Sequence, residues 1–305
     1  KNISPGSIST NPGDLLDVNG TLYFTIDMEN PVTTNRGLWK SDGTEAGTVK
    51  VAGTYANEIS FGYIRPTNLV NVNGTVFFIG EWPSLPLGRT LWKSDGTEAG
   101  TVMVSTNVSR FPYGINPSYL TPFNNEVYFA AKIDGEGGGG LWKSDGTDAG
   151  TVMVKDMDLS SVDGGVQHLA NVNNTLYFGG FNSSFNNELW KSDGTEAGTV
   201  FVKDVNPGAT GSQPSGFVAH NGQIYFVAST AAYGGEIWKT DGTAAGTVLV
   251  ADLYEGASST FVYVPGDKPI ISMNNALYLV GYLDNDLGQE LYKLTETILP
   301  VVWED

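Results

Sequence analysis

A seven-residue motif recurs six times along this chain at almost constant spacing, and this repetition limits the possible folds more than any other feature of the sequence. Four copies read LWKSDGT, one reads IWKTDGT, and the last is the diverged LYKLTET. The copies begin at Leu38, Leu91, Leu141, Leu189, Ile237 and Leu291. They lie about 50 residues apart, a period typical of arrays in which one supersecondary unit is repeated. The chain is therefore expected to fold as six similar units.

Each repeated unit contains four short segments rich in Val, Leu, Tyr, Phe and Trp, and Gly, Asn, Asp or Pro separate them. In the fourth unit the segments read HLANVNN, TLYFGGF, ELWKSDG and TVFVKDV, which is a pattern typical of β-strands. Asn173 and Asn174 join the first two segments and tolerate the positive φ angles of a two-residue hairpin. The loop DGTEAGT joins the last two, and its Asp can cap the turn. The pattern predicts a four-stranded antiparallel sheet in every unit.

Radial repetition of four-stranded units about 50 residues long is typical of a β-propeller, and no segment shows a helical period. We predict an all-β fold, a six-bladed β-propeller with four antiparallel strands per blade, formed by a single domain over residues 1–305. The approximate blades are 1–52, 53–106, 107–155, 156–204, 205–252 and 253–305. A solenoid is the alternative, but its terminal repeats would need a polar outer face, and the first and last units keep the common apolar pattern.

The first strand of each blade is expected to be innermost, so that small or polar residues near its end line a narrow, wet channel. These residues are Asp17, Asn71, Pro122, Asn171, Ala219 and Ser272. His168 and His220 also fall on first strands, and we expect no zinc ion there. Residues 301–303 are expected to be the fourth strand of the last blade, with no strand exchanged between the first and last blades.

The segment LYF followed by ELWKSDGTEAGTV resembles the ELWxxDGT repeat family, also called hyalin-like, which occurs in large secreted or surface proteins of bacteria. The resemblance covers all six units, and it implies an extracellular or cell-surface location with a signal peptide absent from this sequence. LYFGG at residues 176–180 is similar, more weakly, to a kelch blade. The SDGT turn is similar to the Asp box of sialidases, but its order and spacing differ. Neither of the weaker similarities transfers an active site.

Composition excludes several classes of function. The chain has 33 acidic residues against 16 Lys and Arg and a net charge of −17, which would repel a nucleic acid backbone. It has no cysteine and two histidines, so disulfides, thiolate metal sites and three-histidine zinc sites are excluded. No apolar run is long enough to span a membrane. We expect no cofactor; calcium at the loop aspartates is the alternative, but one carboxylate per hairpin falls short of its coordination number.

The residues that every unit repeats are expected to be structural. The Trp row, Trp39, Trp92, Trp142, Trp190 and Trp238 with Tyr292, should pack in the core, because a blade is buried on both faces. The lysines that follow, Lys40, Lys93, Lys143, Lys191, Lys239 and Lys293, should form weak ion pairs at the rim beside the loop aspartates. The loop aspartates themselves should cap their hairpins.

The segments that differ most between units are expected at one end of the strands. In an antiparallel blade, the repeated hairpins lie at one end of the strands, and the dissimilar loops and blade-to-blade crossings lie at the other. Binding residues usually occupy such variable loops on a rigid scaffold, and aromatic planes with forked Arg donors suit a sugar or a peptide. The candidate ligand-binding residues are Trp82, Arg89, Arg110, Phe111, Tyr113, Tyr63, Phe181, Phe185, Tyr233 and Tyr263.

Three functions fit these observations. The first is an extracellular, non-catalytic binding or adhesion module that recognises a glycan or a protein on the variable-loop face, within a larger surface protein or assembly. The second is a carbohydrate-active enzyme of glycosidase or lyase type at the channel mouth, for which no catalytic residue can be assigned from the sequence. The third is a structural spacer with no ligand.

Overall fold

The structure is a computed structural model of the chain. It describes residues 1–3, 10–27, 35–52, 65–81, 88–105, 115–132, 139–157, 165–181, 186–208, 210–253, 255–257, 260, 269–281, 290–294 and 299–300. These residues form six four-stranded antiparallel sheets and contain no helix, which confirms the predicted all-β fold. The chain divides into two compact units, Lys1–Gly164 and Gly165–Asp305, and each is described by itself.

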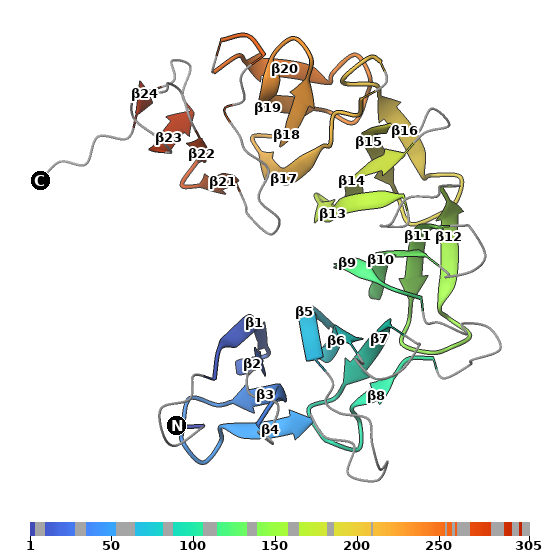
Figure 1. Cartoon of the computed structure of the whole chain (residues 1–305), viewed down its shortest axis with the longest axis vertical. Helices are drawn as coiled ribbons and strands as arrows, with labels where there is room; N and C mark the ends of the chain where they lie inside the picture. The colour runs from blue at the N-terminus through green and yellow to red at the C-terminus, as the bar shows by residue number, and fades with distance from the viewer. Residues whose placement is uncertain are drawn as a thin grey trace, which may run out of the picture. The chain divides into compact units, whose positions relative to one another are not determined.

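The first unit, Lys1–Gly164, contains three sheets, and every strand in them pairs with its neighbours in sequence (Figure 1). The first sheet consists of β1 (Pro12–Val18), β2 (Thr21–Ile26), β3 (Gly37–Ser41) and β4 (Val49–Ala52). The second consists of β5 (Arg65–Val72), β6 (Thr75–Glu81), β7 (Arg89–Ser94) and β8 (Val102–Met103). The third consists of β9 (Ser118–Phe123), β10 (Glu126–Lys132), β11 (Gly139–Ser144) and β12 (Val152–Asp156).

The second unit, Gly165–Asp305, repeats this organisation in three further sheets. They consist of β13 (Val166–Val172), β14 (Thr175–Phe181), β15 (Asn187–Ser192) and β16 (Val200–Lys203); β17 (Ser215–His220), β18 (Gln223–Thr230), β19 (Gly234–Thr240) and β20 (Val248–Ala251); and β21 (Ile270–Met273), β22 (Ala276–Gly281), β23 (Glu290–Leu294) and β24 (Leu299–Pro300). The fourth strand of the last sheet, expected at residues 301–303, is described at Leu299–Pro300; residues 301–303 themselves lie outside the described residues.

Hairpin chemistry explains why each unit folds locally as a meander. The two residues between first and second strands have positive φ, as predicted: 53° at Asn19 and 84° at Gly20, and 51° and 57° at Asn173 and Asn174. Asn tolerates this region better than most residues with a side chain, and Gly adopts it without steric cost. The hairpin register then places every other residue of the second strand on the same face of the sheet.

The core of each unit lies between neighbouring sheets. In the first unit, Phe77, Phe129 and Trp142 pack in one cluster and Phe78 with Trp92 in another. Phe78 and Trp92 stack with ring centroids 6.1 Å apart. The first strands of successive sheets are in contact within each unit, β1 with β5 and β13 with β17. His168 and His220 lie on β13 and β17, as predicted.

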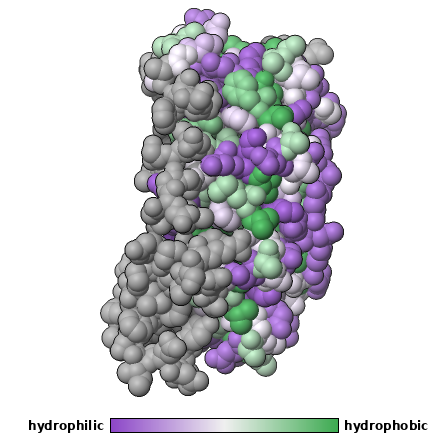
Figure 2. Space-filling view, turned by 90° about the vertical axis from the view of Figure 1, so that its right-hand side faces the viewer, coloured by the Kyte–Doolittle hydropathy of each residue, from purple (hydrophilic) through white to green (hydrophobic). Residues whose placement is uncertain are grey.

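The Trp row is buried as predicted, with one exception. Trp39, Trp92, Trp142, Trp238 and Tyr292 are all below 9% exposed. Trp190 is only partly buried, and the ring of the exposed Phe201 meets its ring edge-on, with the centroids 5.7 Å apart. Figure 2 shows hydrophilic and hydrophobic residues intermingled on the face that it draws.

Candidate functional site

Each sheet has two ends of different character. The strand order places the connections between first and second strands and between third and fourth strands at the same end, which we call the turn edge. The connections between second and third strands, and the crossings to the next sheet, lie at the other end, the loop edge. The repeated motifs therefore occupy the turn edge and the variable segments the loop edge, as the sequence predicts.

Three of the ten predicted binding residues fall within the described structure. Arg89 begins β7 at the loop edge of the first unit, where the backbone of Glu81 on β6 stands opposite Arg65 of β5 and Arg89 of β7 in the strand register. Phe181 ends β14, and Tyr233 lies in the three-residue loop between β18 and β19 with 40% of its surface exposed. The other seven lie outside the described residues: Trp82, Arg110, Phe111, Tyr113, Tyr63, Phe185 and Tyr263.

The loop edge of the second unit is organised by a buried glutamate that the sequence argument missed. Glu188 on β15 has no exposed surface. Its Oε2 accepts hydrogen bonds from the Val205 amide at 2.7 Å and the Ser212 hydroxyl at 2.6 Å, and its Oε1 accepts one from the Ser212 amide at 3.0 Å. One side chain therefore fixes both ends of the crossing from β16 to β17.

The next sheet repeats this arrangement. Glu236 on β19, also without exposed surface, accepts hydrogen bonds from the amides of Leu253 at 3.0 Å and Thr260 at 3.1 Å. Burial raises the pKa of Glu188 and of Glu236 above the ordinary value, and the hydrogen bonds oppose that rise. The sequence carried a signal for both residues, because Glu precedes the apolar-aromatic pair in the last three units and in none of the first three.

Asn206 connects this crossing to the loop that carries Tyr233. Its Nδ2 donates to the carbonyl oxygen of Thr210 at 2.8 Å, and its Oδ1 accepts from the amide of Ala231 at 3.0 Å. Asn206 is itself 6% exposed. The exposed Tyr233 ring is thus displayed by a loop whose backbone is bonded to the crossing from the preceding sheet.

At the turn edge, the loop aspartates cap their hairpins as predicted. Oδ1 of Asp95 accepts from the Thr97 amide at 2.9 Å and the Thr97 hydroxyl at 2.7 Å. The same pair of bonds occurs at Asp42, Asp145, Asp193 and Asp241. Because these bonds favour the ionised form, the pKa of each aspartate is lowered.

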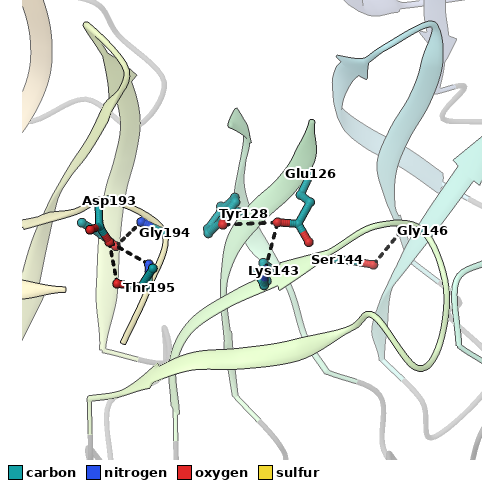
Figure 3. A network of polar contacts seen from close by, with 9 residues as sticks. Glu126, Tyr128, Lys143, Ser144, Gly146, Asp193, Gly194 and Thr195 are labelled. Atoms are coloured by element: carbon teal, nitrogen blue, oxygen red, sulfur yellow. Dashed lines mark hydrogen bonds and ion pairs between the residues drawn. The ribbon is translucent and has the colours of Figure 1, made fainter. Parts of the chain in front are cut away.

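The lysine row differs from the predicted ion pairs. Lys40 Nζ donates to the Gly96 carbonyl of the next sheet at 2.8 Å, and Lys191 Nζ donates to the Gly242 carbonyl at 2.9 Å. Each of these lysines also attracts the capping aspartate of that next hairpin, Asp95 for Lys40 and Asp241 for Lys191. Lys143 instead pairs with Glu126 at 3.0 Å, and Glu126 also accepts from the Tyr128 hydroxyl at 3.4 Å (Figure 3).

A cleft of about 470 Å³ opens at the turn edge of the first unit, between the sheets β5–β8 and β9–β12. Its lining residues are Val72, Asn73, Thr75, Phe77, Lys93, Ser94, Asp95, Ala99, Gly100, Val102, Asn125 and Asp145. Across the part of the chain that the structure describes, no three His, Asp or Glu side chains lie close enough to hold a metal ion. No helix suited to crossing a membrane was found in that part either.

Neither the models of known protein families nor the curated protein sequences match this chain. Among solved structures, it is similar to a puromycin hydrolase, with a TM-score of 0.52 and 13% identity over 96% of this chain and 52% of that one. A structure titled as one of two prolyl endopeptidases gives a TM-score of 0.56 at 12% identity, over 96% and 41% of the two chains. A puromycin-hydrolyzing peptidase of Mycobacterium tuberculosis gives 0.55 at 10%, over 94% and 43%.

This chain spans about half, or less, of the length of those proteins. Identities this low carry no assignment of activity. Together with the six four-stranded sheets, the similarities show a β-propeller-like all-β fold.

Proposed function

We propose that the six sheets close into a six-bladed β-propeller, and that this propeller is an extracellular, non-catalytic binding module whose loop edge recognises a glycan. Regular contact between sheets supports the ring. The first turn residue of one sheet lies against the second turn residue of the next, Asn73 Nδ2 donating to Asn125 Oδ1 at 3.1 Å. Asn19 lies in the same way beside Gly74.

Closure of the ring can be tested with cysteine pairs, because the chain has no cysteine of its own. In a closed ring, the first turn residue of the last sheet, Asn274, would lie against the second turn residue of the first sheet, Gly20. We expect the double variant Asn274→Cys with Gly20→Cys to form a disulfide under mild oxidation. The pair Asn73→Cys with Asn125→Cys, placed at an observed contact, is the positive control. Cross-linking of the control pair alone would show that the ring does not close.

The observation that carries the binding function is the bonding of the loop edge in the second unit. Glu188 and Asn206 fix the crossing after β16, and Asn206 also holds the loop that displays Tyr233. A rigid framework under exposed aromatic side chains loses little conformational entropy when it binds. Binding sites are commonly built from loops held in this way.

The charged groups of the described residues support binding rather than catalysis. Glu188 and Glu236 are fully buried and hydrogen-bonded to backbone amides, so they do not face a substrate. The loop aspartates have lowered pKa values and bond their own hairpins, so they are poor proton donors at neutral pH. The acidic chain favours a neutral ligand over a nucleic acid, and the family resemblance supports a place at the cell surface, in a larger protein or assembly.

A glycan array on purified wild-type protein is the first test, followed by single variants. Tyr233→Ala should weaken glycan binding by about 1 to 3 kcal/mol, the range for aromatic anchors. Phe201→Ala removes an equally exposed ring from β16 and should leave affinity unchanged. Equal effects of the two variants would contradict a site at the loop edge.

The sequence also predicts binding by Trp82, which can be compared with a core tryptophan. Trp82→Ala should lower affinity in a protein that remains folded, whereas Trp142→Ala should lower stability by about 3 to 5 kcal/mol because Trp142 lies in the core. Unchanged affinity in Trp82→Ala would move the site toward Phe181, Phe185 and Tyr233.

A further inference from the structure

One repeat has a different residue type on its second strand, and that residue lines the turn-edge cleft. The second strand carries a tyrosine at the same position in five of the six units, Tyr23, Tyr128, Tyr177, Tyr225 and Tyr278. The second repeat, which belongs to the first unit, has Phe77 there. Phe77 is one of the residues that line the cleft.

The tyrosine hydroxyl has a defined place where the neighbouring turn is described. A Cβ built on Gly96 would lie 2.2 Å from the Tyr23 hydroxyl, and one built on Gly242 would lie 3.0 Å from the Tyr177 hydroxyl. At the corresponding turn beside Phe77, a Cβ on Gly146 would lie 3.1 Å from the ring tip, which bears no hydroxyl. A polar atom that occupies the other two junctions is therefore missing from this one.

The lysine of the same junction also differs. Lys40 and Lys191 donate to the carbonyl oxygens of Gly96 and Gly242. Lys93 lies beside Gly146, with its Cδ 3.3 Å from the Cβ position, but among the described residues its ammonium has no hydrogen bond. Asp145 attracts it electrostatically. Within the described part of the chain, the donors of Lys93 are thus available to a ligand in the cleft that it lines.

The cleft has the size and lining of a small-molecule site. Its volume of 470 Å³ lies within the range of about 300 to 1,000 Å³ that such sites occupy. Val72 and Phe77 are buried and supply its apolar part. The exposed polar groups around it are Asn73, Asp95, Asn125 and Asp145. The apolar part of the cleft is therefore surrounded by hydrogen-bond donors and acceptors of polar side chains.

We propose that this cleft binds one neutral, hydroxyl-rich saccharide unit. Sugar hydroxyls both donate and accept, so they match carboxylate and amide oxygens on one side and an ammonium on the other. The two carboxylates outnumber the single ammonium, and the whole chain carries a charge of −17, so an anionic ligand is disfavoured. The hydrophobic face of a sugar ring would lie against Val102, the exposed apolar side chain of the lining.

This site goes beyond the function proposed for the loop edge, because it lies at the turn edge of the first unit and is formed by other residues. The two proposals stand on different residues and can fail separately.

The decisive variant is Phe77→Tyr, which restores the residue of the other five repeats and places a hydroxyl beside Gly146, at the turn that borders the cleft. It should fold normally, since Tyr23 and Tyr177 are accommodated at the equivalent junctions. Lys93→Met removes the free ammonium while keeping a long side chain. Tyr177→Phe and Lys191→Met are the matched controls at the junction beside Gly242 in the second unit, outside the cleft lining.

The measurement is titration with glucose, galactose, mannose and N-acetylglucosamine, followed by isotope-edited NMR of the Asn73 and Asn125 side-chain amides. We expect at least one neutral sugar to shift these signals, and glucuronate to bind more weakly than glucose. Lys93→Met should weaken binding by about tenfold, which corresponds to the loss of one hydrogen bond to a charged group. Phe77→Tyr should also weaken binding, because its added hydroxyl takes the place beside Gly146 that lies next to the Lys93 side chain. Tyr177→Phe and Lys191→Met should bind as wild type does.

Three results would overturn the proposal: no shift of either amide with any of the four sugars at millimolar concentration, undiminished binding in Phe77→Tyr, or equal weakening in the matched controls. Tyr233→Ala serves as a further comparison, because it tests the loop edge and should leave these titrations unchanged. Loss of glycan-array binding in Tyr233→Ala with retained sugar titration would separate the two sites.

Discussion

The two units differ at one position of the repeat, the residue before the apolar-aromatic pair of the third strand. The first unit has Gly37, Thr90 and Gly140 there, and the second has Glu188, Glu236 and Glu290. In the second unit, the carboxylates of Glu188 and Glu236 hold the chain that leaves the fourth strand. The same repeat position therefore determines whether a sheet carries a side chain that fastens its crossing.

The first unit uses this position for close packing instead. A Cβ on Gly140 would lie 2.0 Å from the Lys155 carbonyl oxygen, so the backbone of β12 occupies the space where a side chain would be. Thr90 accepts a hydrogen bond from the Trp92 indole at 2.9 Å and stays within its own sheet. The same four-stranded sheet can therefore be combined with a crossing that a glutamate hydrogen-bonds or with two strands that pack closely at this position.

The largest expected effect is that of Glu188→Ala. Removing the carboxylate leaves the Val205 and Ser212 amides and the Ser212 hydroxyl buried without an acceptor, and the expected loss is about 4 kcal/mol of unfolding free energy. Thr90→Ala, at the equivalent position of the first unit, should cost about 1 kcal/mol because it removes one acceptor. Urea unfolding of both variants measures the difference, and equal losses would contradict the distinction between the units.

Gly140→Ala should have the next largest effect, about 2 kcal/mol, because the added methyl group meets backbone rather than a flexible side chain. Gly13→Ala is the control, since its Cβ would meet only Thr25 Oγ1 at an ordinary 3.4 Å. Thermal unfolding checks both. A Gly140→Ala protein as stable as Gly13→Ala would show that β12 can move away from β11.

Glu188→Gln should have a smaller effect that depends on pH. Burial raises the pKa of Glu188 above 4.5, so the folded state binds the proton more tightly than the unfolded state. The contribution of this group is fully present below the unfolded pKa and is lost as the pH rises through the raised value. The difference in stability between wild type and Glu188→Gln should therefore be greatest near pH 4 and shrink toward neutrality. Unfolding curves across this range test it, and a difference that grows with pH would contradict the sign.

The smallest effect on stability is expected at the capping aspartates, which both units share. The capping aspartates Asp145 and Asp193 have lowered pKa values, so they stabilise the folded state above the unfolded pKa, and this contribution is lost as the pH falls through the folded value. Asp145→Asn and Asp193→Asn should each reduce the melting temperature slightly at pH 7, by similar amounts, and the reduction should vanish in acid. Calorimetry at two pH values checks this, and a large effect in one unit alone would show that the two hairpins are not equivalent.

Much of the fold could be predicted because its signals are local. Asn173 and Asn174 determine a hairpin through their own tolerance of positive φ, and Asp95 bonds a threonine two residues away. The crossing after β16 could not be predicted in this way, because Glu188 bonds residues 17 and 24 positions further along the chain. Seven of the predicted binding residues lie outside the described structure, and their roles remain predictions.

The turn-edge cleft could likewise be predicted only in part from the sequence. The replacement of tyrosine by Phe77 was visible in the repeats, but its meaning depends on the turn of the next sheet, which brings Gly146 within van der Waals range of the ring. The partner of each lysine also depends on the neighbouring sheet, since Lys40 bonds a carbonyl 56 residues away.

The sequence by itself determined the six units, the strands, the two kinds of hairpin and the burial of the tryptophan row, because each follows from turn chemistry and alternation within a few residues. Only the tertiary structure decided which groups meet across sheets: the lysine to the neighbouring carbonyl, the buried glutamates to the crossings, and the polar residues around the turn-edge cleft. These contacts depend on how one sheet packs against the next, and that packing joins residues too distant in sequence for any local pattern to relate them.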